Sequence, residues 1–174
     1  VNTVLQNTEK WMGNPNRPKL APPRRPSEGP LKLDKDVFLV KGKPYFFFGY
    51  GHFDAVARDL QNFPALGASI IQDGRCGPSA ISADGSYSDA FKHQWVDLDS
   101  AAKNGMRTDY LLSPHYFPAW AIQQTPEIAS GAAGNIGFNI DQPRARQIIS
   151  NWIKTLGEKL RDKPALLTIC LSNE

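Results

Sequence analysis

Polar and aromatic side chains that could do chemistry gather at four places in the chain, and each place directly follows an apolar run. If these runs are strands of a parallel sheet, their carboxyl ends meet at one edge, where α/β folds assemble their sites. The sequence therefore predicts a site at that edge. Its members are Tyr50 and His52 after residues 45–48, Asp73 and Arg75 after residues 69–72, His115, Tyr116 and Trp120 after residues 108–112, and Asn173 and Glu174 after residues 166–171.

Glu174 is the residue best suited to acid–base catalysis, because an apolar run over residues 166–171 delivers it to this edge. Partial desolvation raises the pKa of a carboxyl group. A carboxylic acid of raised pKa can protonate a departing glycosidic oxygen. A second carboxylate must then stand about 5 Å away as nucleophile, or further away as base. The alternative is a glutamate in ordinary contact with solvent.

Several other chemistries are poorly supported by the motifs. The segment 49–54 has the place of a dinucleotide fingerprint, but Asp54 stands where its third glycine belongs and would repel a pyrophosphate. The three histidines lack metal-ligand spacing, no Walker sequence is present, and Asp84-Gly85-Ser86 has too few acidic residues for a calcium loop. We therefore expect neither a metal nor a cofactor.

The charge and the apolar runs restrict the partners. Lys and Arg number 20 against 17 Asp and Glu, a net charge of +3 that gives no reason to expect nucleic acid. The longest apolar runs are far shorter than the roughly 20 residues that cross a bilayer, so no membrane span is expected. No signal peptide is visible after Val1. We expect a trimmed start that hides any signal, which leaves the compartment unknown and a secreted or periplasmic location open.

Two regions follow from the composition. Residues 1–36 are rich in proline, as in a linker or a strap laid on another surface. From residue 37 onward, residues 37–40 and 45–48 predict a hairpin that leads into a buried strand. Strands are then predicted at 45–48, 69–72, 108–112 and 166–171. A helix is predicted from about Ala55 to Leu66 and closed by Gly67, a second from near Ser88 and ended by Gly105, and a third capped by Asp141 with Pro143 just inside it.

The resulting order, β-α-β-α-β-α-β, predicts an α/β fold with four parallel strands side by side. A complete (β/α)8 TIM barrel needs roughly 250 residues, more than the 174 here. The order thus favours the first half of such a barrel, strands 1–4 within residues 37–174, over an open four-stranded sheet. We expect the remaining half of the barrel in the same polypeptide or in a partner chain.

Four segments, in the right order, resemble clan A retaining glycoside hydrolases of the β-galactosidase-like and agarase-like kind. Residues 164–174 resemble the fourth barrel strand, which ends in an Asn-Glu pair. Residues 40–49 resemble the hairpin and first strand, residues 66–72 with Gly77-Pro78 the second strand, and residues 112–120 the exit of the third. Many clan members place an arginine at the end of strand two, whereas Gln72 occupies that position here and Arg75 lies further on.

The resemblance implies a retaining double displacement on β-linked sugars, β-galactosides above all, with a β-linked oligo- or polysaccharide as substrate. It implies that Glu174 is the acid/base and that Asn173 contacts the sugar 2-hydroxyl. His115 would offer a hydrogen bond to the sugar, and Tyr116 and Trp120 would offer ring faces. Packing in the core is an equally good interpretation of Trp120. The clan's nucleophile is a glutamate on strand seven, outside this chain. The rival prediction is a non-catalytic carbohydrate-binding or scaffold half-barrel.

Overall fold

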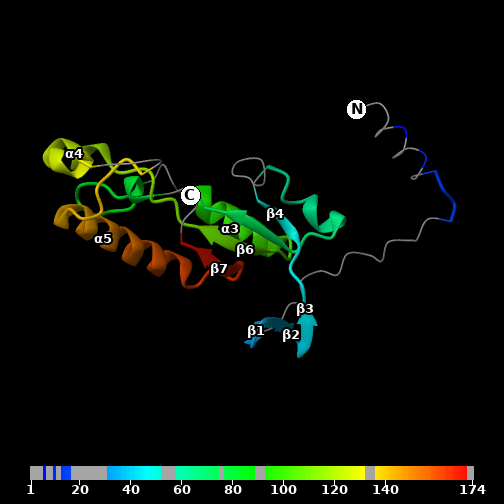
Figure 1. Cartoon of the computed structure of the whole chain (residues 1–174). Coiled ribbons are helices and arrows are strands. Elements are labelled where there is room, and N and C mark those ends of the chain that lie inside the picture. Colours follow the sequence, from blue (N-terminus) through cyan, green and yellow to red (C-terminus); the bar gives the residue numbers. More distant parts are fainter. Residues whose placement is uncertain are drawn as a thin grey trace.

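A computed structural model describes residues 6, 10, 13–16, 31–51, 58–74, 77–88, 93–131 and 136–171. These residues form two separate sheets, a three-stranded antiparallel one and a four-stranded parallel one. Figure 1 shows the small antiparallel sheet set apart from the main body, to which it is joined by the segment that leads into the parallel sheet.

The antiparallel sheet consists of β1 (Leu31–Asp34), β2 (Val37–Val40) and β3 (Lys43–Tyr45) in that order. Both of its turns use positive φ angles, 54° at Lys35 and 74° at Gly42. The sequence predicted the β2–β3 hairpin. It did not predict β1, which lies inside the predicted proline-rich strap, so that the boundary expected at residue 36 falls in the β1–β2 turn.

The parallel sheet contains β4 (Gly49–Gly51), β5 (Ile70–Asp73), β6 (Arg107–Leu111) and β7 (Leu166–Cys170), in chain order. The prediction of four parallel strands side by side is therefore confirmed. The last three strands lie within one residue of their predicted positions. The mostly apolar sequences of β5 and β7 are typical of strands that helices cover.

The prediction of the first parallel strand at residues 45–48 is wrong, because the strand begins four residues later, at Gly49. Tyr45 belongs to β3, and Phe46 is 87% exposed in the connection that follows. The strand forms instead at Gly49–Gly51, where the backbones come unusually close. A Cβ on Gly49 would lie 1.6 Å from the carbonyl oxygen of Ile70, so only glycine fits there.

Two long helices, α3 (His93–Lys103) and α5 (Pro143–Leu160), supply the main core. Apolar side chains of these helices pack with Ile71 of β5 and Tyr110 of β6. Because side chains alternate along a strand, the residues next to Ile71 and Tyr110 point to the opposite face of the sheet. The buried cluster is Leu60, Ala68, Ile71, Ala80, Ile81, Leu98, Ala101, Met106, Tyr110, Leu112, Trp152, Leu156, Leu160 and Ala165. Gly105 follows α3 at a φ of 68°, as predicted for a helix stop.

Shorter helices lie in the connections: η1 (Phe63–Leu66), η2 (Pro78–Ala80), α4 (Ala119–Gln124) and η4 (Pro126–Ala129). The helix predicted from Ala55 to Leu66 begins outside the described residues and ends as the 3-10 turn η1. Leu66, assigned to its buried face, is 65% exposed. Gly67 closes this turn with a φ of 86°, as predicted. No helix in the described ranges is both long and apolar enough to cross a membrane.

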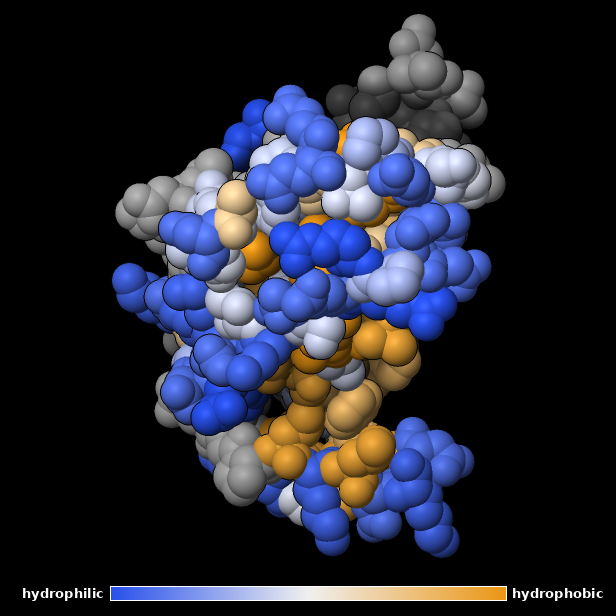
Figure 2. All heavy atoms as spheres, turned by 90° about the vertical axis from the view of Figure 1, so that its left-hand side faces the viewer, coloured by the Kyte–Doolittle hydropathy of each residue, from blue (hydrophilic) through white to orange (hydrophobic). Residues whose placement is uncertain are grey.

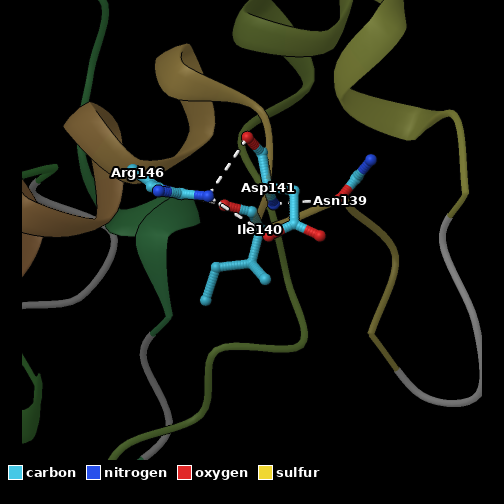
Figure 3. A network of polar contacts seen from close by, with 4 residues as sticks. All are labelled: Asn139, Ile140, Asp141 and Arg146. Atoms are coloured by element: carbon cyan, nitrogen blue, oxygen red, sulfur yellow. Dashed lines mark hydrogen bonds and ion pairs between the residues drawn. The ribbon is translucent and has the colours of Figure 1, made fainter.

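The start of α5 differs from the prediction by one residue. Gln142, rather than Asp141, is the N-cap, and its side chain makes no capping bond. Asp141 accepts a hydrogen bond from Arg146 instead, at 3.2 Å, and its own N–H donates to Asn139 Oδ1 at 2.9 Å (Figure 3). Pro143 stands at the first helical position, as predicted.

Candidate functional site

The structure describes five of the nine predicted site residues. Tyr50, expected to follow the first parallel strand, lies within β4 and stacks on Phe63 with ring centroids 5.0 Å apart. Asp73 ends β5, while His115, Tyr116 and Trp120 follow β6, its hydrogen-bonded neighbour. All four therefore belong to the carboxyl edge of the parallel sheet. The other four predicted residues, His52, Arg75, Asn173 and Glu174, lie outside the described residues.

The loops after β5 and β6 pack against each other through their backbones. The N–H of Ser79 donates to the carbonyl oxygen of Tyr116 at 3.0 Å. A Cβ on Gly77 would lie 2.2 Å from the oxygen of Ser113, and one on Gly74 would lie 2.3 Å from the oxygen of Leu111. We call residues 77–81 and 113–120 the rim block, because these close contacts join the two loops into one unit.

Tyr116 projects from the rim block into solvent, with 66% of its surface exposed. The ring of His115 packs edge-on against it, with centroids 6.3 Å apart and planes at 84°. The Nδ1 atom of His115 is buried and has no hydrogen-bond partner. The aromatic pair thus has one half-buried member beneath one exposed member.

Trp120 is held by the protein itself. Its indole N–H donates to the carbonyl oxygen of Ile81 at 2.9 Å, across the rim block. Its half-buried ring packs on a second apolar cluster that includes Ile128 and Phe138. These contacts support the core-packing interpretation of Trp120, because the polar end of the indole is already satisfied.

Asp73 is buried at the end of β5, and its Oδ1 accepts a hydrogen bond from the N–H of Gly74 at 2.8 Å. Gly74 has a φ of 131°, which L side chains rarely adopt. The carboxylate therefore contributes to the sharp turn that starts the loop after β5.

A polar ladder that the sequence analysis missed crosses three strands. Gln72 Nε2 donates to Asp109 Oδ2 at 3.0 Å, and Thr168 Oγ1 donates to Asp109 Oδ1 at 2.6 Å. These residues alternate with Ile71 and Tyr110 of the helix-covered core, so the ladder lies on the opposite face of the sheet. The available signal was a polar residue within each strand: Gln72 and Thr168 in mostly apolar strands, and Asp109 at the centre of β6.

An apolar groove with a cavity of about 520 Å³ lies beside the last strand. We define it by its lining: Leu112, Pro114, Gly131, Ile136, Phe138, Asn139, Ile140, Asp141, Ile149, Trp152, Ile153 and Leu171. The turn drawn in Figure 3 forms part of its wall, where Arg146 also donates to the carbonyl oxygen of Ile140 at 2.9 Å. Figure 2 shows a face that is mostly hydrophilic, with hydrophobic atoms gathered low on it, at about the height of the antiparallel sheet in Figure 1 and below that of the groove.

Metal ligands do not gather in the part of the chain that the structure describes: it holds no group of three or more His, Cys, Asp or Glu side chains that could bind an ion. Asp84 instead accepts hydrogen bonds from the hydroxyl of Ser86 at 2.7 Å and from its N–H at 2.9 Å. The side-chain bond, followed by the backbone bond, holds the pKa of Asp84 below its ordinary value.

Comparison with known proteins gives likenesses of fold. No family model matches the sequence, and no curated protein sequence matches it either. An exo-carrageenase GH42 from Bacteroides ovatus matches 96% of this chain with a TM-score of 0.59 at 19% identity. A catalytic mutant of a GH42 β-galactosidase from G. stearothermophilus matches 74% with a TM-score of 0.53 at 21% identity. The β-galactosidase of the psychrophilic Marinomonas ef1 matches 73% with a TM-score of 0.53 at 15% identity.

These matches cover only part of the similar enzymes. The chain spans 22% of the carrageenase, 21% of the G. stearothermophilus enzyme and 22% of the Marinomonas enzyme. All three are glycoside hydrolases of TIM-barrel fold. The resemblance that four sequence segments indicated is therefore confirmed at the level of fold: the chain is similar to part of a β-galactosidase-like barrel.

Proposed function

We propose that residues 37–174 are the first half of the (β/α)8 barrel of a retaining glycoside hydrolase that cleaves β-linked sugars, β-galactosides in the first place. The observation that supports the proposal is the order of the parallel sheet: β4, β5, β6 and β7 lie side by side in chain order, as barrel strands 1–4 would. An Asn-Glu pair then follows the fourth strand after two intervening residues. Fold similarity to GH42 β-galactosidases supports the same conclusion.

In this proposal Glu174 is the acid/base. Its carboxylic acid donates a proton to the glycosidic oxygen as the bond from that oxygen to the anomeric carbon breaks. A carboxylate from the other half of the barrel bonds to the anomeric carbon and forms a covalent intermediate. Glu174, now a carboxylate, takes a proton from water, whose oxygen attacks the same carbon and releases the nucleophile.

Asn173 has the supporting role of a hydrogen-bond partner for the sugar 2-hydroxyl, an interaction that strengthens as the oxocarbenium-like state forms. In the sequence Asn173 follows β7, which pairs with β6, the strand that precedes the second loop of the rim block. Leu111 pairs with Cys170, and the N–H of Leu112 donates to the oxygen of Cys170 at 2.9 Å. The residues that follow β6 and β7 therefore leave the sheet at the same edge.

The test is Glu174→Gln in the complete protein, assayed on a β-galactoside with a poor leaving group. Glutamine keeps the size of the side chain but cannot donate the proton, so we expect a loss in turnover of about 10²–10⁴-fold with folding intact. A matched control is Glu127→Gln, which changes an exposed glutamate of η4 and should leave turnover unchanged. Equal turnover of Glu174→Gln and the unmodified protein would refute the assignment.

The second candidate is a half-barrel that binds carbohydrate without cleaving it, and the exposed ring of Tyr116 on the rim block favours it. It predicts heat of binding with galacto- or gluco-oligosaccharides in titration calorimetry and no new reducing ends. A hydrolase releases reducing ends from the same sugars, so the two assays run together separate the candidates.

A further inference from the structure

We propose that Asn104-Gly105 is a site of spontaneous covalent modification, at which the asparagine loses ammonia and becomes aspartate or isoaspartate, and that the end of α3 controls the rate. It is the only Asn-Gly pair in the sequence. The inference concerns the chemical stability of the chain and does not depend on the proposed glycoside hydrolase function.

The reaction needs only water besides the chain itself. The backbone nitrogen of Gly105 loses its proton and bonds to Cγ of Asn104, and the bond from Cγ to the amide nitrogen breaks, so that ammonia leaves. Water then opens the cyclic imide that has formed. Opening at one carbonyl group gives aspartate. Opening at the other gives isoaspartate, in which the main chain runs through the Cβ and Cγ atoms of the residue.

Glycine follows Asn104 because the end of the helix requires it. Gly105 has a φ of 68°, which glycine adopts without strain. A Cβ on Gly105 would meet nothing within 4 Å, so conformation rather than space selects glycine here. The residue that ends α3 therefore also leaves the nitrogen next to Asn104 without a side chain to hinder its attack.

The nitrogen that must attack is held in the folded chain. The N–H of Gly105 donates to the carbonyl oxygen of Ala102 at 2.9 Å, and the N–H of Met106 donates to that of Ala101 at 2.9 Å. This pair of hydrogen bonds is the Schellman motif that commonly ends helices. Met106 and Ala101 are both buried in the main core, which anchors the turn. Gly105 can attack only after its hydrogen bond to Ala102 breaks.

The amide that must leave is held as well. The Nδ2 atom of Asn104 donates to the carbonyl oxygen of Ser100 at 2.9 Å, and the backbone N–H of Asn104 donates to the same oxygen at 3.0 Å. The side chain is thus turned back along the helix, whereas the reaction requires Cγ to approach Gly105. Helix ends open more readily than the rest of a fold. The modification therefore proceeds through local opening of the last turn of α3.

The product weakens the same helix end that slows its formation. A carboxylate at residue 104 has no proton to donate to the oxygen of Ser100. It also places a negative charge at the carboxyl end of α3, where the helix dipole disfavours it. Isoaspartate lengthens the main chain just before β6, whose first residue, Arg107, donates its N–H to the oxygen of Ser69 at 2.9 Å. The turn consequently opens more often in modified molecules.

The experiment follows the complete protein at mildly alkaline pH, both folded and unfolded in guanidinium chloride. Mass spectrometry of the peptide that contains residue 104 measures the fractions of asparagine, aspartate and isoaspartate over time. We expect asparagine to disappear at least about tenfold more slowly in the folded protein, because only molecules with an open turn react.

Two matched variants separate local opening from global unfolding. Lys103→Gly weakens the last turn of α3 at an exposed position and should speed the reaction in the folded protein about threefold. Lys154→Gly makes the same change at an exposed position of α5 and should leave that rate unchanged. Each rate is compared with that of the same variant in the unfolded state, which removes any direct chemical effect of the substitution.

Each outcome has a defined meaning. The absence of conversion at residue 104 in the unfolded protein overturns the site itself. Equal rates in the folded and unfolded protein overturn control by the end of α3. A Lys103→Gly variant that reacts no faster than the unmodified protein, or no faster than Lys154→Gly, refutes local opening as the route. None of these results depends on whether the protein cleaves a sugar.

Discussion

Ile153 lies on α5 in the apolar groove, and 48% of its surface is exposed in this chain. If the remaining half of a barrel covers the groove, the side chain becomes buried in the complete protein. Ile153→Ala removes three methyl or methylene groups, at about 0.8 kcal/mol each when buried. The expected cost is therefore about 1.2 kcal/mol with the groove half open and about 2.4 kcal/mol with it covered, before any cavity is counted.

The assay is equilibrium unfolding of the complete protein in urea, with the free energy of unfolding compared between variants. Lys154→Ala, one position along on the exposed side of α5, is the matched control and should change that free energy by no more than about 0.5 kcal/mol. Trp152→Ala removes a fully buried ring and sets the upper reference at about 3–5 kcal/mol. A cost for Ile153→Ala of about 1.2 kcal/mol or less would mean that the groove stays open, and would refute barrel completion at this face.

Two further predictions concern hydrogen bonds. Asp109→Ala leaves the amide of Gln72 and the hydroxyl of Thr168 without their acceptor. Because the first bond is partly buried and the second exposed, we expect a cost of about 0.5–1.5 kcal/mol in urea unfolding. Asp109→Asn keeps one acceptor oxygen and should cost less; equal costs would contradict the ladder. The lowered pKa of Asp84 means that its bonds to Ser86 stabilise the fold above the ordinary aspartate pKa and are lost as pH falls through the lowered value. Ser86→Ala should raise the Asp84 pKa in a carboxyl-carbon NMR titration, and an unchanged value would contradict this cause.

The sequence predicts β5, β6 and β7 well because burial under helices leaves an unmistakable pattern. β5 and β7 are short, mostly apolar runs, as covered parallel strands need, whereas β6 is recognised by its buried Tyr110 and Leu111 between turn residues. The helix stops at Gly67 and Gly105 were equally readable, since both require positive φ angles that glycine adopts without strain.

The first parallel strand could not be predicted in the same way, because two signals contradict each other there. The aromatic run that ends at Phe48 has high strand propensity, yet Phe46 is the most exposed large apolar residue described. The strand itself contains Gly49 and Gly51, which propensity alone assigns to a turn. What decides the position is the contact of Gly49 with the backbone of Ile70, and this contact exists only in three dimensions.

For the site residues that the structure describes, the sequence could indicate their place in the fold but not their contacts. His115 and Tyr116 lie at the strand-end edge as expected, because that position follows from chain order alone. The role of Trp120 depends on the carbonyl group of Ile81, 39 residues away, and no local pattern contains that distance. The same holds for Gly77, whose importance comes from a carbonyl group of another loop.

The order of the parallel sheet also has a consequence for how the protein is made. Every parallel strand after the first pairs with the one immediately before it in the chain, so the sheet grows at a single edge. On the ribosome, each β-α unit can add to this edge as soon as it emerges, without waiting for a distant partner. At each stage the newest strand presents unpaired N–H and carbonyl groups, so the growing edge is the part of the sheet that is open to pairing until the next strand arrives.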